Sequence, residues 1–139
     1  MPQPTPFHNR TSALCESYEW REWSGYLAAA TYEPSHEREY FAIRNSAALI
    51  DVSPLFKYEI IGPDAQPAVD RIITRDLSRC RVGQVLYTPW CDEEGKVIDD
   101  GTVARLDENR FRITAADPNL RWFQDVSYGF DVQVVDVSQ

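Results

Sequence analysis

The stretch that decides the fold of this chain is KVIDDGTVARLDENRFRITA, which spans residues 96–115. Residues 96–106 and 110–115 carry the β-branched and apolar side chains that favour strands. Between them, Asp107-Glu108-Asn109 has the composition of a tight turn. The stretch therefore predicts two antiparallel strands joined as a β-hairpin.

The first strand of this hairpin contains two adjacent carboxylates, Asp99 and Asp100. Aspartate is depleted in strands, and departures of this kind tend to occur at functional sites. Because successive side chains of a strand point to opposite faces, only one of the two carboxylates can face a given pocket. The alternative is a purely structural pair of carboxylates that faces solvent beside a turn.

The chain on either side of the hairpin predicts further strands and helices. We expect strands at 56–61, 85–90 and 130–137, and helices at 65–74 and from Asp117 to Gly129. Asp117 is the expected N-cap of the second helix, with Pro118 at its first position. From residue 56 the order is β-α-β-β-β-α-β, which apart from one extra strand is the ferredoxin-like split β-α-β plan. We therefore predict an α+β domain with two helices on one face of an antiparallel or mixed sheet.

Residues 1–55 do not fit into this unit and predict the start of a second, incomplete domain. Residues 7–34 are aromatic and irregular, and we expect loops with short helical pieces there. A helix is expected from Ser35, as its N-cap, to about Ala47. The apolar residues of 49–54 predict a short strand-like stretch that ends at a proline.

The composition excludes several classes of protein. A hydrophobic content of 43% predicts a packed core, and a net charge of −8 argues against nucleic acid as a partner. No apolar run approaches the roughly 20 residues of a membrane-spanning helix, and the first residues lack a signal-peptide pattern. We therefore expect no membrane partner and a cytoplasmic location. The three cysteines form no CxxC pair and only two histidines are present, so we expect reduced thiols and no metal site.

Five short motifs resemble, in order and spacing, those of the glycine-cleavage T-protein (aminomethyltransferase) family. The longest, Ala42 to Ser53, is similar to the family's AVR…AGLFDVS segment, and residues 91–100 are similar to its CNExGGVIDD segment. The other three are Ile61 to Ala65 (GPDA in the family), Thr74 to Leu77 (TND) and Gly83 to Tyr87 (GxAxY). Each motif is weak alone, but together they identify the chain as a member of this family.

The resemblance implies an enzyme that uses tetrahydrofolate to transfer a methyl or aminomethyl group. The family also includes folate-dependent demethylases and the folate domains of dimethylglycine- and sarcosine-oxidising enzymes. Its members are considerably longer than this chain, and their first domain is split around an inserted second domain. By that analogy, residues 1–55 are the N-terminal segment of a split folate-binding domain and residues 56–139 are the inserted ferredoxin-like domain. This chain alone is then expected to be incomplete and inactive.

The implied partners are folate and a small donor, which is a methylated amine, a sulfonium compound or an aryl ether. A lipoyl carrier protein stays open as a further partner. The family's DVSHM is here DVS followed by Pro54, which is more similar to the demethylase and amine-oxidising members. Ala115 replaces an asparagine that helps line the folate site, and Ala104 stands where tyrosine is frequent. These two alanines favour the alternative of a catalytically inactive folate-family scaffold with a binding or regulatory role.

Carried over residue by residue, the resemblance makes Asp100 the catalytic residue. Its carboxylate near the N5/N10 edge of folate would orient the pterin and stabilise cationic character during transfer. The other residues implied to bind the cofactor are Tyr87, which would pack on the folate, and the lining residues Leu55, Thr102 and Ile113. Ordinary core packing is the alternative for these four. Asp99 faces the other way and is expected to support a hydrogen bond or meet solvent.

One aromatic group lies outside these motifs. Trp20, Trp23 and Tyr26 are close in sequence and would suit a methylated cation, because aromatic faces attract such cations. Core packing is again the alternative for these three residues.

Overall fold

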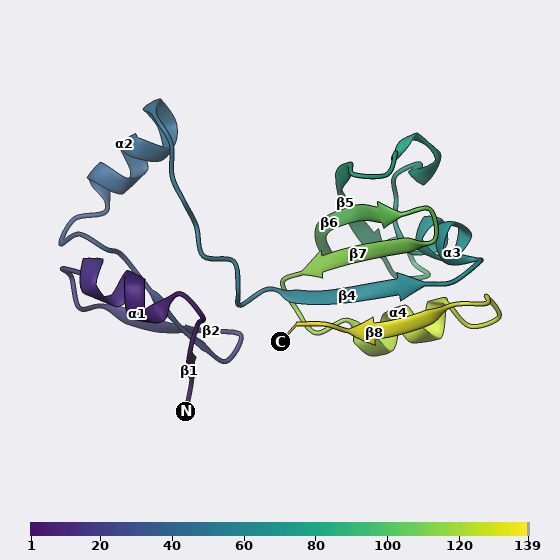
Figure 1. Cartoon of the computed structure of the whole chain (residues 1–139), viewed down its shortest axis with the longest axis horizontal. Helices are drawn as coiled ribbons and strands as arrows, with labels where there is room; N and C mark the ends of the chain where they lie inside the picture. The colour runs from purple at the N-terminus through teal and green to yellow at the C-terminus, as the bar shows by residue number, and fades with distance from the viewer. Residues whose placement is uncertain (139) are drawn as a thin grey trace. The chain divides into compact units, whose positions relative to one another are not determined.

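The structure is a computed structural model that describes residues 1–138. The chain divides into two compact units, Met1–Pro54 and a second unit from Leu55 to the end of the chain. Both are drawn in Figure 1. No helix within residues 1–138 is long and apolar enough to span a membrane.

The first unit is a small sheet with three short helical segments. Its elements are β1 (Gln3–Pro4), α1 (His8–Thr11), the 3-10 helix η1 (Ser12–Leu14), β2 (Trp20–Trp23), β3 (Tyr26–Ala29) and α2 (Glu37–Asn45). The strand order is β1-β3-β2, with β1 parallel to β3 and β2 antiparallel to it.

The expectation of loops and helical pieces over 7–34 is therefore wrong at β2 and β3. These strands are joined by only two residues, Ser24 and Gly25, which both have positive φ (47° and 82°). Such a two-residue connection matches the twist of a hairpin. The two strands lack the alternating pattern of a half-buried strand, because β2 has two adjacent charged residues between its tryptophans and β3 is apolar at every position.

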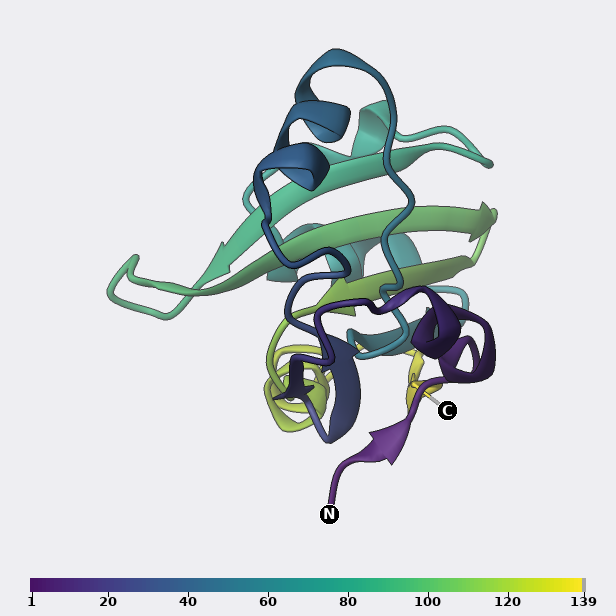
Figure 2. The ribbon, with the colours of Figure 1, turned by 90° about the vertical axis from the view of Figure 1, so that its left-hand side faces the viewer.

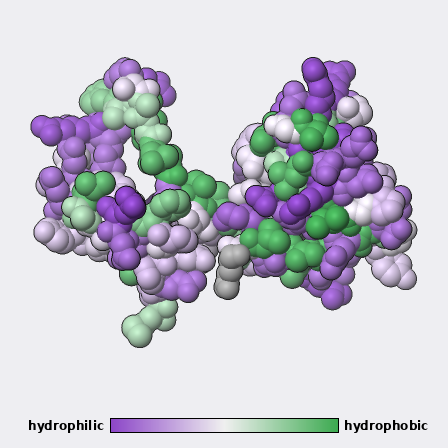
Figure 3. Space-filling view, in the orientation of Figure 1, coloured by the Kyte–Doolittle hydropathy of each residue, from purple (hydrophilic) through white to green (hydrophobic). Residues whose placement is uncertain are grey.

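The segment after α2 also differs from the expectation. The helix is shorter than predicted at both ends, and residues 49–54 form no strand. Leu49 and Ile50 are 100% and 64% exposed. Figure 3 shows hydrophobic atoms gathered along this segment.

The second unit has the predicted split β-α-β plan. Its elements are β4 (Phe56–Ile61), α3 (Ala65–Ile72), η2 (Leu77–Arg79), β5 (Val85–Cys91), β6 (Val97–Asp107), β7 (Arg110–Ala115), α4 (Leu120–Val126) and β8 (Gln133–Asp136). All neighbours in the sheet order β5-β6-β7-β4-β8 are antiparallel. Strand β5 is the extra strand and pairs with β6 at one edge, where the two can be followed in Figure 2.

The two faces of this sheet have different side chains. Both α3 and α4 pack on one face (Figure 1). The core between this face and the helices is made by buried apolar residues of every strand but β8 and of both helices, among them Tyr58, Trp90, Val103, Phe111, Ile113 and Phe123. The opposite face, which we call the helix-free face, carries the alternate residues of the same strands. Figure 3 shows hydrophilic atoms over β4 and β7 on this side.

Helix α4 begins later than the sequence predicts. Its first residue is Leu120 and its N-cap is Asn119, so the prediction of Asp117 as N-cap and Pro118 as first residue is wrong. The first helical bond runs from the Phe123 N–H to the Asn119 carbonyl (3.0 Å), and tertiary bonds to Tyr58 and Asp99 fix Asn119 at this position. Helix α3 likewise ends at Ile72, two residues before the predicted end.

Candidate functional site

Asp100 lies on the helix-free face of the sheet, next to Tyr87. The register pairs Asp100 with Pro89 and Thr102 with Tyr87, so Tyr87 is a diagonal neighbour of Asp100 on the same face. The Tyr87 hydroxyl donates a hydrogen bond to Asp100 Oδ2, and this bond raises the pKa of Tyr87. Tyr87 is 61% exposed, so the carboxylate–phenol pair is accessible.

A second row of polar side chains lies beside this pair. Thr102 is opposite Tyr87 on one side and Thr114 on the other, and Thr114 is opposite Lys57. The structure thus brings three of the expected site residues together on one face: Asp100, Tyr87 and Thr102. Thr114 joins them, although the sequence analysis does not single it out.

The other two expected lining residues lie elsewhere. Ile113 is 0% exposed and belongs to the core between the sheet and its helices. It therefore points away from Asp100, because its neighbour Thr114 occupies the helix-free face. Leu55 lies half-buried just before β4, and its carbonyl accepts a hydrogen bond from Lys57 Nζ (2.5 Å).

The two alanines at expected pocket positions also separate. Ala115 is 1% exposed and packs in the core between the sheet and its helices. Alanine at this position therefore does not change the helix-free face. Ala104 does lie on that face, between Val85 of β5 and Arg112 of β7.

Asp99 has a structural position on the opposite side of β6. Its Oδ2 accepts hydrogen bonds from the Asp117 N–H (3.0 Å) and from Asn119 Nδ2 (2.9 Å). Asn119 in turn accepts from Trp90 Nε1 (3.3 Å), and its N–H donates to the Tyr58 hydroxyl (3.0 Å). Asp99 therefore fastens the N-terminus of α4 to β6, which is the hydrogen-bonding alternative expected from the sequence.

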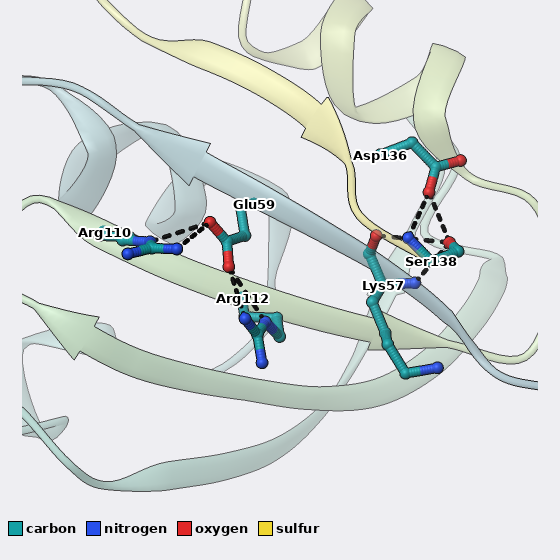
Figure 4. Close-up of polar contacts among 6 residues, drawn as sticks. All are labelled: Lys57, Glu59, Arg110, Arg112, Asp136 and Ser138. Atoms are coloured by element: carbon teal, nitrogen blue, oxygen red, sulfur yellow. Dashed lines mark hydrogen bonds and ion pairs between the residues drawn. The ribbon is translucent and has the colours of Figure 1, made fainter. Parts of the chain in front are cut away.

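A charged cluster occupies the other end of the helix-free face. The Glu59 side chain is only 4% exposed and forms ion pairs with Arg110 and Arg112 of the neighbouring strand (Figure 4). Burial pushes the pKa of Glu59 upward, but the hydrogen bonds and charges of the two arginines outweigh it and lower that pKa overall. Sequence analysis does not identify this cluster, although charged residues at alternate positions of both strands are the signal that points to it.

Loss of the Glu59 charge is expected to destabilise the protein. Glu59→Gln should lower the free energy of unfolding by about 1–3 kcal/mol at pH 7, because two arginines lose a charged acceptor. A lowered pKa contributes stability that is present above the ordinary glutamate pKa of about 4.3 and is lost as pH falls through the folded value. The difference from wild type in denaturant unfolding should therefore shrink below about pH 4. Exposed Glu93→Gln is the control, and an unchanged difference at low pH would contradict the assignment.

The close contact between β6 and β7 beside Asp100 requires a glycine at position 101. A Cβ on Gly101 would lie 1.8 Å from the Thr114 carbonyl oxygen, so the backbones must move apart. Gly101→Ala should cost about 1–3 kcal/mol in the free energy of unfolding. It should also speed amide exchange in β6.

Gly83→Ala is a useful control for this substitution. Gly83 has open space around it but a positive φ (84°), so the added methyl group causes backbone strain alone, of about 1 kcal/mol. Equal exchange rates in β6 of both variants would contradict the steric explanation.

The first unit contains a separate cavity of about 520 Å³. Two of the three aromatic residues singled out from the sequence, Trp20 and Trp23, line it together with Tyr32 and Glu39. Tyr26 is not among its lining residues. The Glu39 carboxylate accepts hydrogen bonds from the backbone N–H groups of Tyr32 (2.7 Å) and Glu33 (3.1 Å).

Fold and site together define a class of protein: an α+β chain whose split β-α-β domain presents an aspartate–tyrosine pair on its helix-free face. The model of the GCVT N-terminal domain family matches residues 7–139, so the chain belongs to this family. This confirms the family resemblance found in the sequence.

Individual relatives agree with this assignment. The chain is 34% identical over 137 residues to a trimethylamine-oxide aldolase of Ruegeria pomeroyi, covering 97% of this chain and 17% of that protein. It is 36% identical over 104 residues to an aminomethyltransferase of Clostridium botulinum, covering 72% of this chain and 28% of that protein. The structure of the glycine cleavage system aminomethyltransferase T from Bartonella henselae has the same fold, with a TM-score of 0.84 at 22% identity over 99% of this chain and 39% of that one. The chain thus spans well under half the length of these relatives.

Proposed function

We propose that this chain is part of a tetrahydrofolate-dependent enzyme that transfers a methyl or aminomethyl group from a small donor. The observation that carries the proposal is the position of Asp100. It is the member of the Asp99–Asp100 pair that lies on the accessible face, and it pairs there with Tyr87. Its neighbour Asp99 lies on the opposite face and accepts hydrogen bonds from Asp117 and Asn119.

The residues around Asp100 fit a bound folate. Folate supplies the nitrogen atoms that accept the one-carbon unit, an aromatic ring system and a terminal carboxylate. The Tyr87 ring and the Thr102 and Thr114 hydroxyls lie on one face with Asp100 and offer aromatic and polar contacts. In the proposed site these residues bind the ring system, and Asp100 lies where positive charge develops.

Asp100 acts in this proposal through its charge. A carboxylate fixed beside a developing cation stabilises the transition state more than water does, because its orientation is already set. The hydrogen bond from Tyr87 sets this orientation, since it holds one carboxylate oxygen and leaves the other available. Tyr87 is therefore both a positioning residue for Asp100 and a surface for the folate.

A methylated amine is the donor class that the relatives favour. The relative that matches 97% of this chain is named a trimethylamine-oxide aldolase, and others are named aminomethyltransferases. Sulfonium and aryl ether donors remain alternatives within the same proposal. We include in the proposal a lipoyl carrier protein as a partner and a cytoplasmic location. We also include the domain assignment: residues 1–55 belong to a split folate-binding domain, and residues 56–139 form the domain inserted in it.

The second candidate is an inactive folate-binding scaffold, which Ala104 on the helix-free face favours. Incubation of the full-length protein with tetrahydrofolate and a panel of methylated amines separates the two. We expect equal amounts of demethylated amine and one-carbon folate, measured by mass spectrometry. Binding of tetrahydrofolate without product from any donor would favour the scaffold, and absence of binding would contradict both candidates.

A further inference from the structure

We propose that Arg110 and Arg112 form a carboxylate-binding site on the helix-free face, and that it takes the glutamate tail of a folate. This inference rests on the proposed function, because it names the part of that substrate which the two arginines would bind. It assigns a binding role to a cluster that lies apart from Asp100 and Tyr87.

The first argument is that the two guanidinium groups are held in fixed positions. Glu59 Oε2 accepts from Arg110 Nε (2.9 Å) and forms an ion pair with Arg110 Nη2 (2.8 Å). Glu59 Oε1 accepts from Arg112 Nε (3.1 Å) and Nη2 (2.7 Å). Figure 4 shows the two side chains on either side of the Glu59 carboxylate. That carboxylate is almost fully buried, so it holds both guanidinium groups against the sheet and leaves their outer sides exposed.

The second argument is that the anchoring leaves donors free for a ligand. A guanidinium has five N–H donors, and Glu59 uses one edge of each arginine. The Nη1 groups make no hydrogen bond within residues 1–138, and the side chains of Arg110 and Arg112 are 49% and 42% exposed. A pre-positioned pair of this kind suits a carboxylate, which accepts two parallel hydrogen bonds from an arginine.

The third argument is charge. The two arginines share the Glu59 carboxylate, and Asp107 of β6 is opposite Arg110. Arg112 is instead opposite Ala104 on β6, so the register places no carboxylate opposite it on that strand. The positive charge of Arg112 therefore favours an anionic group at this row of the sheet.

The fourth argument is the order of groups along the sheet. Asp100, the Thr102–Thr114 row and the row containing Arg112 follow one another at two-residue steps of about 7 Å. A folate has the same order of groups: the amine nitrogens, then the benzoyl ring, then the glutamate carboxylates. Ala104 lies opposite Arg112 in the same row. Because its side chain is a single methyl group, it leaves room for a ligand beside Arg112.

The test compares two ligands, tetrahydrofolate and a tetrahydropterin that lacks the benzoylglutamate tail. Titration calorimetry of the full-length protein measures both affinities in wild type and in Arg112→Gln. We expect the variant to bind tetrahydrofolate about tenfold more weakly or worse, as for the loss of a charge-assisted hydrogen bond, and to bind the tetrahydropterin unchanged. Arg121→Gln, which changes an exposed arginine of α4 that also pairs with a carboxylate, is the matched control and should change neither affinity.

Three outcomes would overturn the inference. If Arg112→Gln binds both ligands as wild type does, the arginines have only a structural role, and the proposed function is untouched. If the variant weakens both ligands equally, or has lost its near-UV circular dichroism, Arg112 acts through the fold. If folded wild type binds neither ligand, the proposed function fails and this inference fails with it.

Discussion

Asp100→Asn in the full-length protein is expected to lower kcat by about 10²–10⁴-fold while the fold survives. The substitution removes a negative charge and keeps the shape of the side chain. An Asn side chain still accepts the hydrogen bond from Tyr87, so the local structure should persist. Stability should change by less than about 0.5 kcal/mol, since Asp100 is exposed.

Asp107→Asn is the matched control for this prediction. Asp107 is an exposed carboxylate at the far end of β6, and its substitution removes the same charge from the same strand. It should leave kcat within about twofold of wild type, because an exposed charge at this distance is largely screened. Wild-type turnover in a well-folded Asp100→Asn protein would refute the role assigned to Asp100.

Asp99→Ala, one residue earlier, should have the opposite signature. It should lower the free energy of unfolding by about 2–4 kcal/mol, because the Asp117 N–H and Asn119 Nδ2 lose a charged acceptor in a mostly buried site. Asn119 also connects Trp90 and Tyr58, so the loss should spread to the attachment of α4. Amide exchange in α4 should therefore rise along with the fall in stability.

Asp100→Ala is the control for Asp99→Ala, since it removes the same atoms from the adjacent residue on the other face. Denaturant unfolding should separate the two variants by at least about 1.5 kcal/mol. Equal stabilities, or slow exchange in α4 of the Asp99→Ala protein, would show that the Asp99 network does not hold the helix.

The sequence predicts the second unit well because its residues obey two simple periodicities. Strands β4 and β7 alternate apolar and polar residues, and α3 places its apolar residues on one face. Asp99 and Asp100 lie on opposite faces of β6 because successive side chains of any strand do so. The first unit is predicted less well, because neither β2 (WREW) nor β3 (YLAA) alternates apolar and polar residues.

In the candidate site, the sequence predicts the contacts within one hairpin but not the contacts between strands that are far apart in the chain. Asp100, Tyr87 and Thr102 come from adjacent strands of one hairpin, and their proximity follows from a local register. The contact of Glu59 with Arg110 and Arg112 depends instead on the pairing of β4 with β7, and these residues are 51 and 53 positions apart in the chain. The late start of α4 has the same origin, since its N-cap Asn119 is bonded to Tyr58 of β4 and to Asp99 of β6. Periodicity does not specify pairings of this kind.

The most direct test of the account is the titration of tetrahydrofolate into the full-length protein, with Asp100→Asn measured alongside. We predict saturable binding by wild type and weaker binding by the variant, because the ligand lies against the Asp100 carboxylate. The account would be contradicted if a folded wild-type protein gave no heat of binding on titration with tetrahydrofolate and no binding in a competition assay with other folates.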